Sequence, residues 1–371
     1  MNSPLLLRIL RNPASALALS PLDWDLLLRQ ARRGLLLTKL AVLLQPMLDR
    51  VPPGPRHHLH AALLTAQRQA KLTHWEVSRI HAALAPLGVE PILLKGTAYL
   101  MAGLPASEGR VFGDVDILVP QAHIAEIEAA LVAQGWEFPD DLDAYDQRYY
   151  REWMHEIPPL THVQRGSSLD VHHTILPPTA RVRVNTAALF EDARALAHQP
   201  GVRVLAPVTM TLHSAAHLFH EGELEKGLRD LFDLDALLRD FGRDPVFWAA
   251  LVPRARVLGL TRPLFHALRY TTRLLGTPVP AEVMVQAVAD APRFQNLLDA
   301  CYERALMPAH ASCNTRLTGV ARLALYVRSH WLRMPFMLLV RHLARKAWLN
   351  TWPAPDAETD QDRQLDSQDG A

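Results

Sequence analysis

Apolar positions recur every three to four residues over most of the chain, and this spacing predicts a mainly helical protein. The spacing is clear between Arg29 and Met47, where leucines follow one another at helical intervals. We interpret the proline-rich segment VPPGPRHHLH as a break, and residues 64–88 as a further helix that ends at Gly88. We therefore expect a helical N-terminal region over residues 1–88.

Short apolar runs replace the helical spacing from residue 89 onward. These runs and the segments between them predict, in order, a strand at 91–94, a turn and short helix at 95–104, a strand at 114–119 and an amphipathic helix at 121–135. The segment THVQRGSSLDVHHTIL then reads as a β-hairpin with Gly166 in its turn. Strands alternating with helices predict an α/β core over residues 89–180.

Helical spacing returns after residue 180 and predicts a helical C-terminal domain over residues 181–350. The last segment, residues 351–371, carries many aspartates and almost no large apolar residues, so we expect a disordered acidic tail. The fold class expected is therefore α+β, with a mixed sheet between two helical regions.

Composition narrows the classes of function. Hydrophobic residues make up 49% of the 371 residues and charged residues 21%, as in ordinary globular proteins. A net charge of +1 argues against a nucleic-acid coat. The only cysteines, Cys301 and Cys313, have no spacing typical of a disulfide framework or a zinc site, and we expect neither a targeting segment nor a spanning helix. A cytoplasmic protein fits these features.

Two aspartates interrupt the apolar run RVFGDVDILVP. Side chains alternate along a strand, so Asp114 and Asp116 share one exposed face, about 7 Å apart, while Val115 and Ile117 face the core. Two carboxylates this close repel one another unless a cation compensates them. Their oxygen ligands favour Mg²⁺ or Mn²⁺.

Other residue types expected at a phosphate-transfer site occur nearby. Asp170 lies on a later predicted strand and supplies a third carboxylate, and His172 faces the same side. Three carboxylates can hold two metal ions that activate an attacking oxygen and stabilise a leaving one. Lys95 either contacts phosphate or pairs with an aspartate, Gly96 permits close backbone approach to a phosphate, and Arg110 adds charge.

Four segments together resemble a known family: LLKGTAYL, RVFGDVDILV, LDVHHTI and LHSAAHLFHEGELEKGLRDLFDLDALL. In order and spacing they are similar to an uncharacterised bacterial nucleotidyltransferase family of the DNA polymerase β-like superfamily, over about Pro91–Leu238. The resemblance implies the following correspondences: the glycine motif at Gly96, metal ligands at Asp114, Asp116 and Asp170, and further family positions at Arg110, His172, His217, Arg229 and Asp233. Thr97 stands where the superfamily usually has Ser or Gly.

The resemblance implies a metal-dependent enzyme that transfers a nucleotidyl group from an NTP to an acceptor and releases pyrophosphate. Asp114, Asp116 and Asp170 would hold Mg²⁺ or Mn²⁺, and Gly96 with Thr97 would approach the phosphates. Neither the acceptor nor the preferred base follows from the sequence. The alternatives are a non-catalytic nucleotide- or peptide-binding accessory protein that retains the fold, and a phosphotransferase of the same fold.

Two further features have alternative interpretations. His213, His217 and His220 share a helix face and either chelate zinc or form a polar seam facing the cleft; no HExxH motif accompanies them. Residues 321–349 contain arginines, a lysine and tryptophans but no acidic residue, so this basic segment either contacts a membrane surface or a partner, or packs on the helical domain.

Overall fold

The computed structural model describes residues 4–335 except 141, 222–223 and 293. The predicted acidic tail and residues 336–349 of the basic segment therefore lie outside the described residues.

Four helices precede the first strand: α1 (Leu5–Arg11), α2 (Pro21–Arg33), α3 (Leu37–Leu44) and α4 (Pro53–Leu84). The predicted break over VPPGPRHHLH is confined to Val51 and Pro52, because α4 runs without interruption from Pro53. Pro53 and Pro55 lie in its first turn, where a backbone N–H has no helical acceptor and proline is tolerated. Gly88, with φ 66°, follows this helix and a short 3₁₀ turn, in agreement with the predicted stop.

The described residues form a seven-stranded mixed sheet in the order β3-β4-β5-β2-β1-β7-β6. Its strands are β1 (Ile92–Leu93), β2 (Asp114–Leu118), β3 (Trp136–Glu137), β4 (Leu160–His162), β5 (Ser168–His172), β6 (Ala193–Leu196) and β7 (Gln199–Leu205). In the centre of the sheet, β2 is parallel to β5 and antiparallel to β1. The α+β class with a mixed sheet is thus confirmed.

The two helices predicted within the sheet region are present as α5 (Lys95–Met101) and α6 (Ile124–Ala133). Two short helices that were not individually predicted follow them, α7 (Ala144–Arg148) and α8 (Thr186–Glu191). The predicted hairpin is also present, because β4 and β5 pair in antiparallel orientation on either side of Gly166, whose φ is 63°. The prediction that residues 181–350 are helical is wrong at the start of this range, since β6 and β7 follow α8. The sequence QPGVRVL of β7 is too short for its apolar residues to establish a strand period, and its pairing with β1 is non-local.

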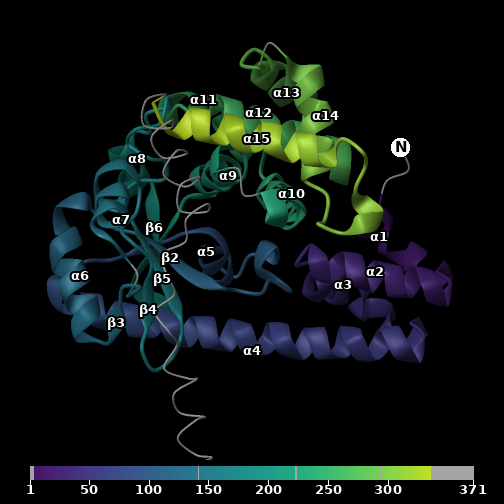
Figure 1. Ribbon diagram of the computed structural model, residues 1–371, viewed down its shortest axis with the longest axis horizontal. Coiled ribbons are helices and arrows are strands. Elements are labelled where there is room, and N and C mark those ends of the chain that lie inside the picture. Colours follow the sequence, from purple (N-terminus) through teal and green to yellow (C-terminus); the bar gives the residue numbers. More distant parts are fainter. Residues whose placement is uncertain (1–3, 141, 222–223, 293, 336–371) are drawn as a thin grey trace, which may run out of the picture.

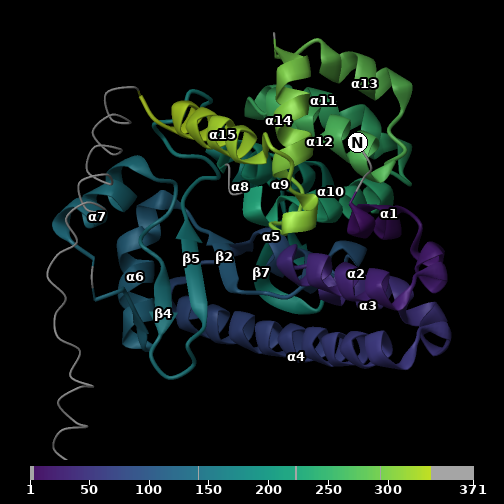
Figure 2. The same cartoon turned by 45° about the vertical axis from the view of Figure 1, so that its right-hand side comes forward.

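The remaining helices are α9 (Pro207–Ala216), α10 (Gly227–Phe241), α11 (Pro245–Leu258), α12 (Thr261–Tyr270), α13 (Ala281–Val288), α14 (Gln295–Ala305) and α15 (Thr318–Arg333). Figures 1 and 2 show α4 along one side of the molecule and the helices from α11 to α15 along the other, with the sheet and the N-terminal helices α2 and α3 between them.

The buried apolar side chains of the described residues form two clusters. One lies around the sheet and takes residues from α4, α6, α9, α11 and α12. The other joins α1–α3 to the helical C-terminal part, with Trp24, Phe219, Tyr270 and Tyr302 among its buried side chains. The N-terminal helices α1–α3 therefore pack on both α4 and the C-terminal helices, and the loop between α2 and α3 lies at the site described below.

None of the helices in the described part of the chain is both long and apolar enough to cross a lipid bilayer.

Candidate active site

Three carboxylates come together on the central strands of the sheet. Asp116 of β2 is the register partner of Asp170 on the parallel strand β5, and Asp114 lies two residues earlier on the same face of β2. Neighbouring strands are about 4.8 Å apart, so Asp116 and Asp170 are immediate neighbours. The structure thus brings together three residues that the sequence placed on two strands.

The prediction of one exposed face for Asp114 and Asp116 is half right. Asp114 at the start of β2 is exposed, whereas only 3% of Asp116 is exposed. Asp116 is buried because two basic side chains cover it. Nζ of Lys95 lies 2.7 Å from Oδ1 of Asp116, and Nε2 of His172 lies 3.1 Å from the same oxygen. Lys95 is therefore in the ion pair that was one of its two predicted roles.

The pKa values of the two neighbouring aspartates are shifted in opposite directions. Burial alone would raise the pKa of Asp116, but Lys95 and His172 overcome this effect and hold its pKa below the ordinary value. Burial raises the pKa of Asp170 to about 8, and the negative charges of Asp116, Glu156 and Asp114 act in the same direction. Burial and the neighbouring carboxylates therefore disfavour a negative charge on Asp170, whereas Lys95 and His172 favour one on Asp116.

Backbone strain also concentrates at this site. Among the described residues, Lys95 (φ 49°) and Leu35 (φ 53°) are the non-glycine residues with positive φ. Both line the same cleft, although they are far apart in sequence. Residues other than glycine adopt this backbone conformation at a cost of about 1–3 kcal/mol, and such strain is common at functional sites.

Gly96 and Thr97 follow Lys95 in the first turn of α5 and line the cleft. A Cβ atom at Gly96 would overlap the side chain of Arg110, so glycine is required here for packing of that arginine. The Thr97 hydroxyl is buried and has no hydrogen-bond partner among the described residues. Burying a hydroxyl without a partner is costly, so this group is a candidate ligand for a phosphate oxygen.

Arg110 joins the sheet region to both helical regions. It forms an ion pair with Asp233 of α10, and Nζ of Lys39 from α3 lies 2.8 Å from Oδ1 of the same aspartate. The side chains of Lys39 and Asp233 are each 2% exposed. Burial lowers the pKa of Lys39 well below its ordinary value, and the charges of Arg110 and Arg229 lower it further. Asp233 is thus the shared counter-charge of two buried cations.

Asp233→Asn is therefore expected to destabilise the protein by about 3 kcal/mol or more, because it leaves Lys39 and Arg110 buried without that carboxylate. Asp240→Asn on the same helix is the matched control. Its partner Arg243 has a side chain that is 78% exposed, and the change should cost less than about 1 kcal/mol. Urea unfolding of both variants measures the difference, and equal midpoints would contradict the assigned role.

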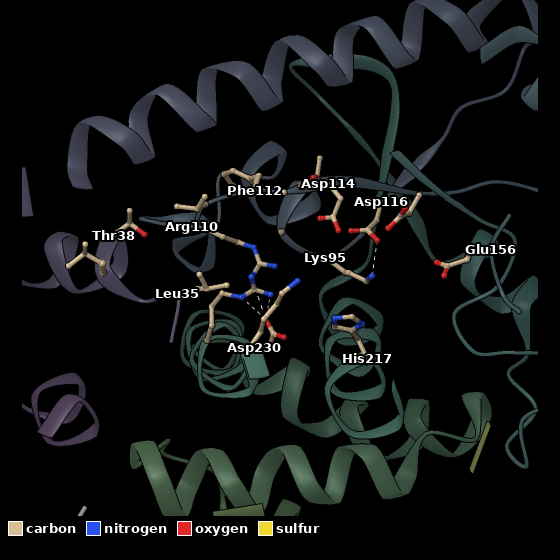
Figure 3. A pocket seen from close by; sticks show the side chains of 18 of the residues that line it. Leu35, Thr38, Lys95, Arg110, Phe112, Asp114, Asp116, Glu156, His217 and Asp230 are labelled. Carbon is tan, nitrogen blue, oxygen red and sulfur yellow. Dashed lines mark hydrogen bonds and ion pairs between the residues drawn. The ribbon is translucent and has the colours of Figure 1, made fainter. Parts of the chain in front are cut away.

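A cleft of about 520 Å³ connects these groups. In Figure 3, Asp114, Asp116 and Glu156 lie toward one side of the cleft, and Leu35, Thr38 and Arg110 toward the other. Its lining also includes basic residues from helical segments, namely Arg32, Lys226 and Arg229. Asp230 lies 2.7 Å from Arg229 and partly offsets this positive charge. The cleft therefore has an acidic part at the sheet and basic groups supplied by the helices.

All eight site residues predicted from the sequence lie in this cleft or directly beside it. Seven of them line the cleft: Lys95, Gly96, Thr97, Arg110, Asp114, Asp116 and Asp170. His172 lies against Asp116 instead. Sequence reasoning did not single out Glu156, His155 or Arg32, which line the cleft as well. His155 and Glu156 are adjacent in the sequence just before β4, and this His-Glu pair was the available signal.

Within the described part of the chain, His213, His217 and His220 do not form a metal site. One other group of three side chains there has ligand atoms close enough together to hold an ion. The helix changes to a wider π-helical turn at His217–Glu221, so the spacing expected of an α-helix fails there. His213 and His220 are buried, whereas His217 lines the cleft. For His217, the interpretation as a polar seam facing the cleft agrees with this geometry.

Comparison with known proteins gives a match to a family model. No match was found among curated proteins or among solved structures. A family model described as "Uncharacterised nucleotidyltransferase" matches residues 20–276, which is more than half of the chain and includes the sheet, α2–α4 and the helices as far as α12. The chain therefore belongs to this nucleotidyltransferase family.

Proposed function

We propose that the protein transfers a nucleotidyl group from an NTP to an acceptor hydroxyl in a reaction that depends on Mg²⁺ or Mn²⁺ and releases pyrophosphate. The observation that carries this proposal is the register of β2 and β5, which places Asp170 beside Asp116 with Asp114 on the same face. Membership of the nucleotidyltransferase family supports the same type of reaction.

The donor set fits a divalent cation. Its members are carboxylates, which suit Mg²⁺ and Mn²⁺. Burial and then the negative charges of Asp116, Glu156 and Asp114 raise the pKa of Asp170, and a divalent ion would offset this repulsion. Asp114, Asp116 and Asp170 are the residues proposed to hold the metal. When bound, the metal would neutralise charge on the phosphates and lower the pKa of the attacking hydroxyl.

The remaining residues position the reactants. The acceptor oxygen attacks the α-phosphorus, a new P–O bond forms, and the bond to the bridging oxygen of the β-phosphate breaks as pyrophosphate leaves. Asp170 takes the acceptor proton. The Thr97 hydroxyl and the cationic groups of Lys95 and Arg110 contact the phosphates, and Gly96 keeps the space in which Arg110 is packed.

Product analysis tests this function. Purified protein incubated with each labelled NTP, Mg²⁺ or Mn²⁺ and a cell extract as source of acceptors is expected to release pyrophosphate and to label an acceptor with the nucleoside monophosphate. Release of the nucleoside diphosphate would instead identify a phosphotransferase. Binding of the NTP without either product would identify a non-catalytic nucleotide-binding protein, and both results would overturn the proposal.

A further inference from the structure

A second group of potential metal ligands lies beside the aspartates. His155 and Glu156 precede β4, and Glu156 is bridged to His172 of β5 in antiparallel orientation. Backbone hydrogen bonds hold this segment on β5: His173 donates its N–H to the carbonyl of His155 at 2.9 Å, and Ile157 donates to Val171 at 3.0 Å. The positions of His155, Glu156 and His172 are therefore fixed by sheet pairing.

Their ligand atoms converge. Nδ1 of His172 lies 3.2 Å from Oε2 of Glu156, and Nε2 of His155 lies 3.9 Å from the same oxygen. One ligand atom from each residue lies within 4.8 Å of the other two. Ligands about 2.0–2.1 Å from a tetrahedral metal are about 3.3–3.4 Å apart. Only a small contraction, within the range of side-chain rotation, would complete such a site.

The environment of His172 matches that of a metal-bound histidine. Its Nε2 lies 3.1 Å from Oδ1 of Asp116, and a hydrogen bond there leaves Nδ1 with a lone pair. Nδ1 is buried and, among the described residues, makes no hydrogen bond. A carboxylate that orients a histidine through its other ring nitrogen is the usual outer partner of a metal-binding imidazole. In this protein the carboxylate of Asp116 is the outer partner of His172.

We propose that His155, Glu156 and His172 bind one transition-metal ion of the zinc type at a site separate from the three aspartates. Two nitrogen donors and one carboxylate favour such an ion over Mg²⁺, which prefers oxygen. Three protein ligands leave a fourth position open. Because His155 and Glu156 line the cleft, that position faces the cleft and can accept water or a donor atom of a substrate.

This second metal goes beyond the proposed nucleotidyl transfer and does not depend on it. A metal ion bound at this site would also affect Asp116. A metal on Nδ1 fixes the tautomer in which Nε2 carries the hydrogen, so His172 remains a donor to Asp116. The occupied site would thereby hold Asp116 in place while leaving its second oxygen for another ligand.

Co²⁺ binding to the chelator-treated full-length protein tests the proposal without any turnover. We expect the intense visible absorption of tetrahedral Co²⁺ at one ion per chain, and displacement of Co²⁺ by Zn²⁺. His155→Gln and Glu156→Gln should each weaken Co²⁺ binding at least about tenfold, as loss of groups in or around a metal site does. Saturating Mg²⁺ should leave the absorption in place.

Two controls locate the ion. His173→Gln changes a buried histidine of the same region that is not a ligand, and Asp114→Asn changes the aspartate site; both should retain Co²⁺ binding. Circular dichroism checks folding, and Glu156→Gln decides the outcome if His155→Gln does not fold, because Glu156 is partly exposed. Absence of the tetrahedral spectrum in the wild type, or its loss in Asp114→Asn but not in Glu156→Gln, would overturn the proposal.

Discussion

Asp116→Asn is expected to lower kcat for nucleotidyl transfer by about a thousandfold or more. A metal ligand in such a site supplies several kcal/mol of charge stabilisation, and about 4 kcal/mol corresponds to a thousandfold in rate. Asp116 is at the centre of the site, since Lys95 and His172 both contact it and Asp170 is its register partner. The measurement is the rate of pyrophosphate release at saturating NTP and metal.

Asp235→Asn is a suitable control for this experiment. Asp235 is also buried, but it lies on α10 outside the cleft and accepts a hydrogen bond from Thr277 at 2.6 Å. Burial raises the pKa of Asp235, so a neutral amide should be tolerated there. We expect its activity to remain within a few-fold of the wild type. Activity of Asp116→Asn equal to that of Asp235→Asn would show that Asp116 is not a catalytic metal ligand.

Asp170→Asn is expected to have opposite effects on activity and on stability. It removes the third proposed metal ligand, so transfer activity should fall. In the metal-free protein, however, it removes a carboxylate that is partly buried beside Asp116, Glu156 and Asp114. At pH 8 the variant should be more stable than the wild type by at least about 1 kcal/mol, which is the free energy of one pKa unit.

The pH dependence of this gain follows from linkage. The pKa of Asp170 is about 8 in the folded protein and near the ordinary carboxyl value of about 4 in the unfolded chain. Between these values the folded state holds a proton that the unfolded state has released, so the stability of the wild type falls as pH rises. Asn cannot ionise, so the difference between the two proteins should grow from pH 5 to about pH 8 and then level off.

Urea unfolding with a chelator at several pH values measures this difference. The comparison isolates Asp170 because both proteins share all other titrating groups. Addition of Mg²⁺ or Mn²⁺ should then stabilise the wild type more than the variant, since binding to the folded state adds to its stability. A variant that is less stable than the wild type across this pH range would show that Asp170 is not in a site with excess negative charge.

Local pattern was sufficient for much of the fold near the site. The alternation in DVDILV predicted β2, Gly135 and Gly166 correctly marked the end of α6 and the hairpin turn, and the spacing in SSLDVHH placed Asp170 and His172 on one strand face. These features depend on neighbours within a few residues, and such neighbours are visible in a single sequence.

Other features depended on partners far along the chain. The pairing of β7 with β1 joins segments about a hundred residues apart, and no local period indicates it. The same holds for Lys39, which looked like an ordinary residue of an amphipathic helix and proved to be buried against Asp233. A single β-bridge to His172 positions Glu156. The loop that contains Glu156 has no repeating pattern from which this position could be predicted.

By itself the sequence determined the candidate residues for the chemistry, namely the three aspartates, the Lys95-Gly96-Thr97 turn and Arg110, because residue type and strand periodicity limit where charge can lie. Only the tertiary structure decided how these residues act on one another. Strand register placed Asp116 beside Asp170. Lys95 and His172 lower the pKa of Asp116, whereas burial and the neighbouring carboxylates raise that of Asp170. Electrostatic energy depends on distance and on exclusion of water, and both arise only when distant segments of the chain pack together.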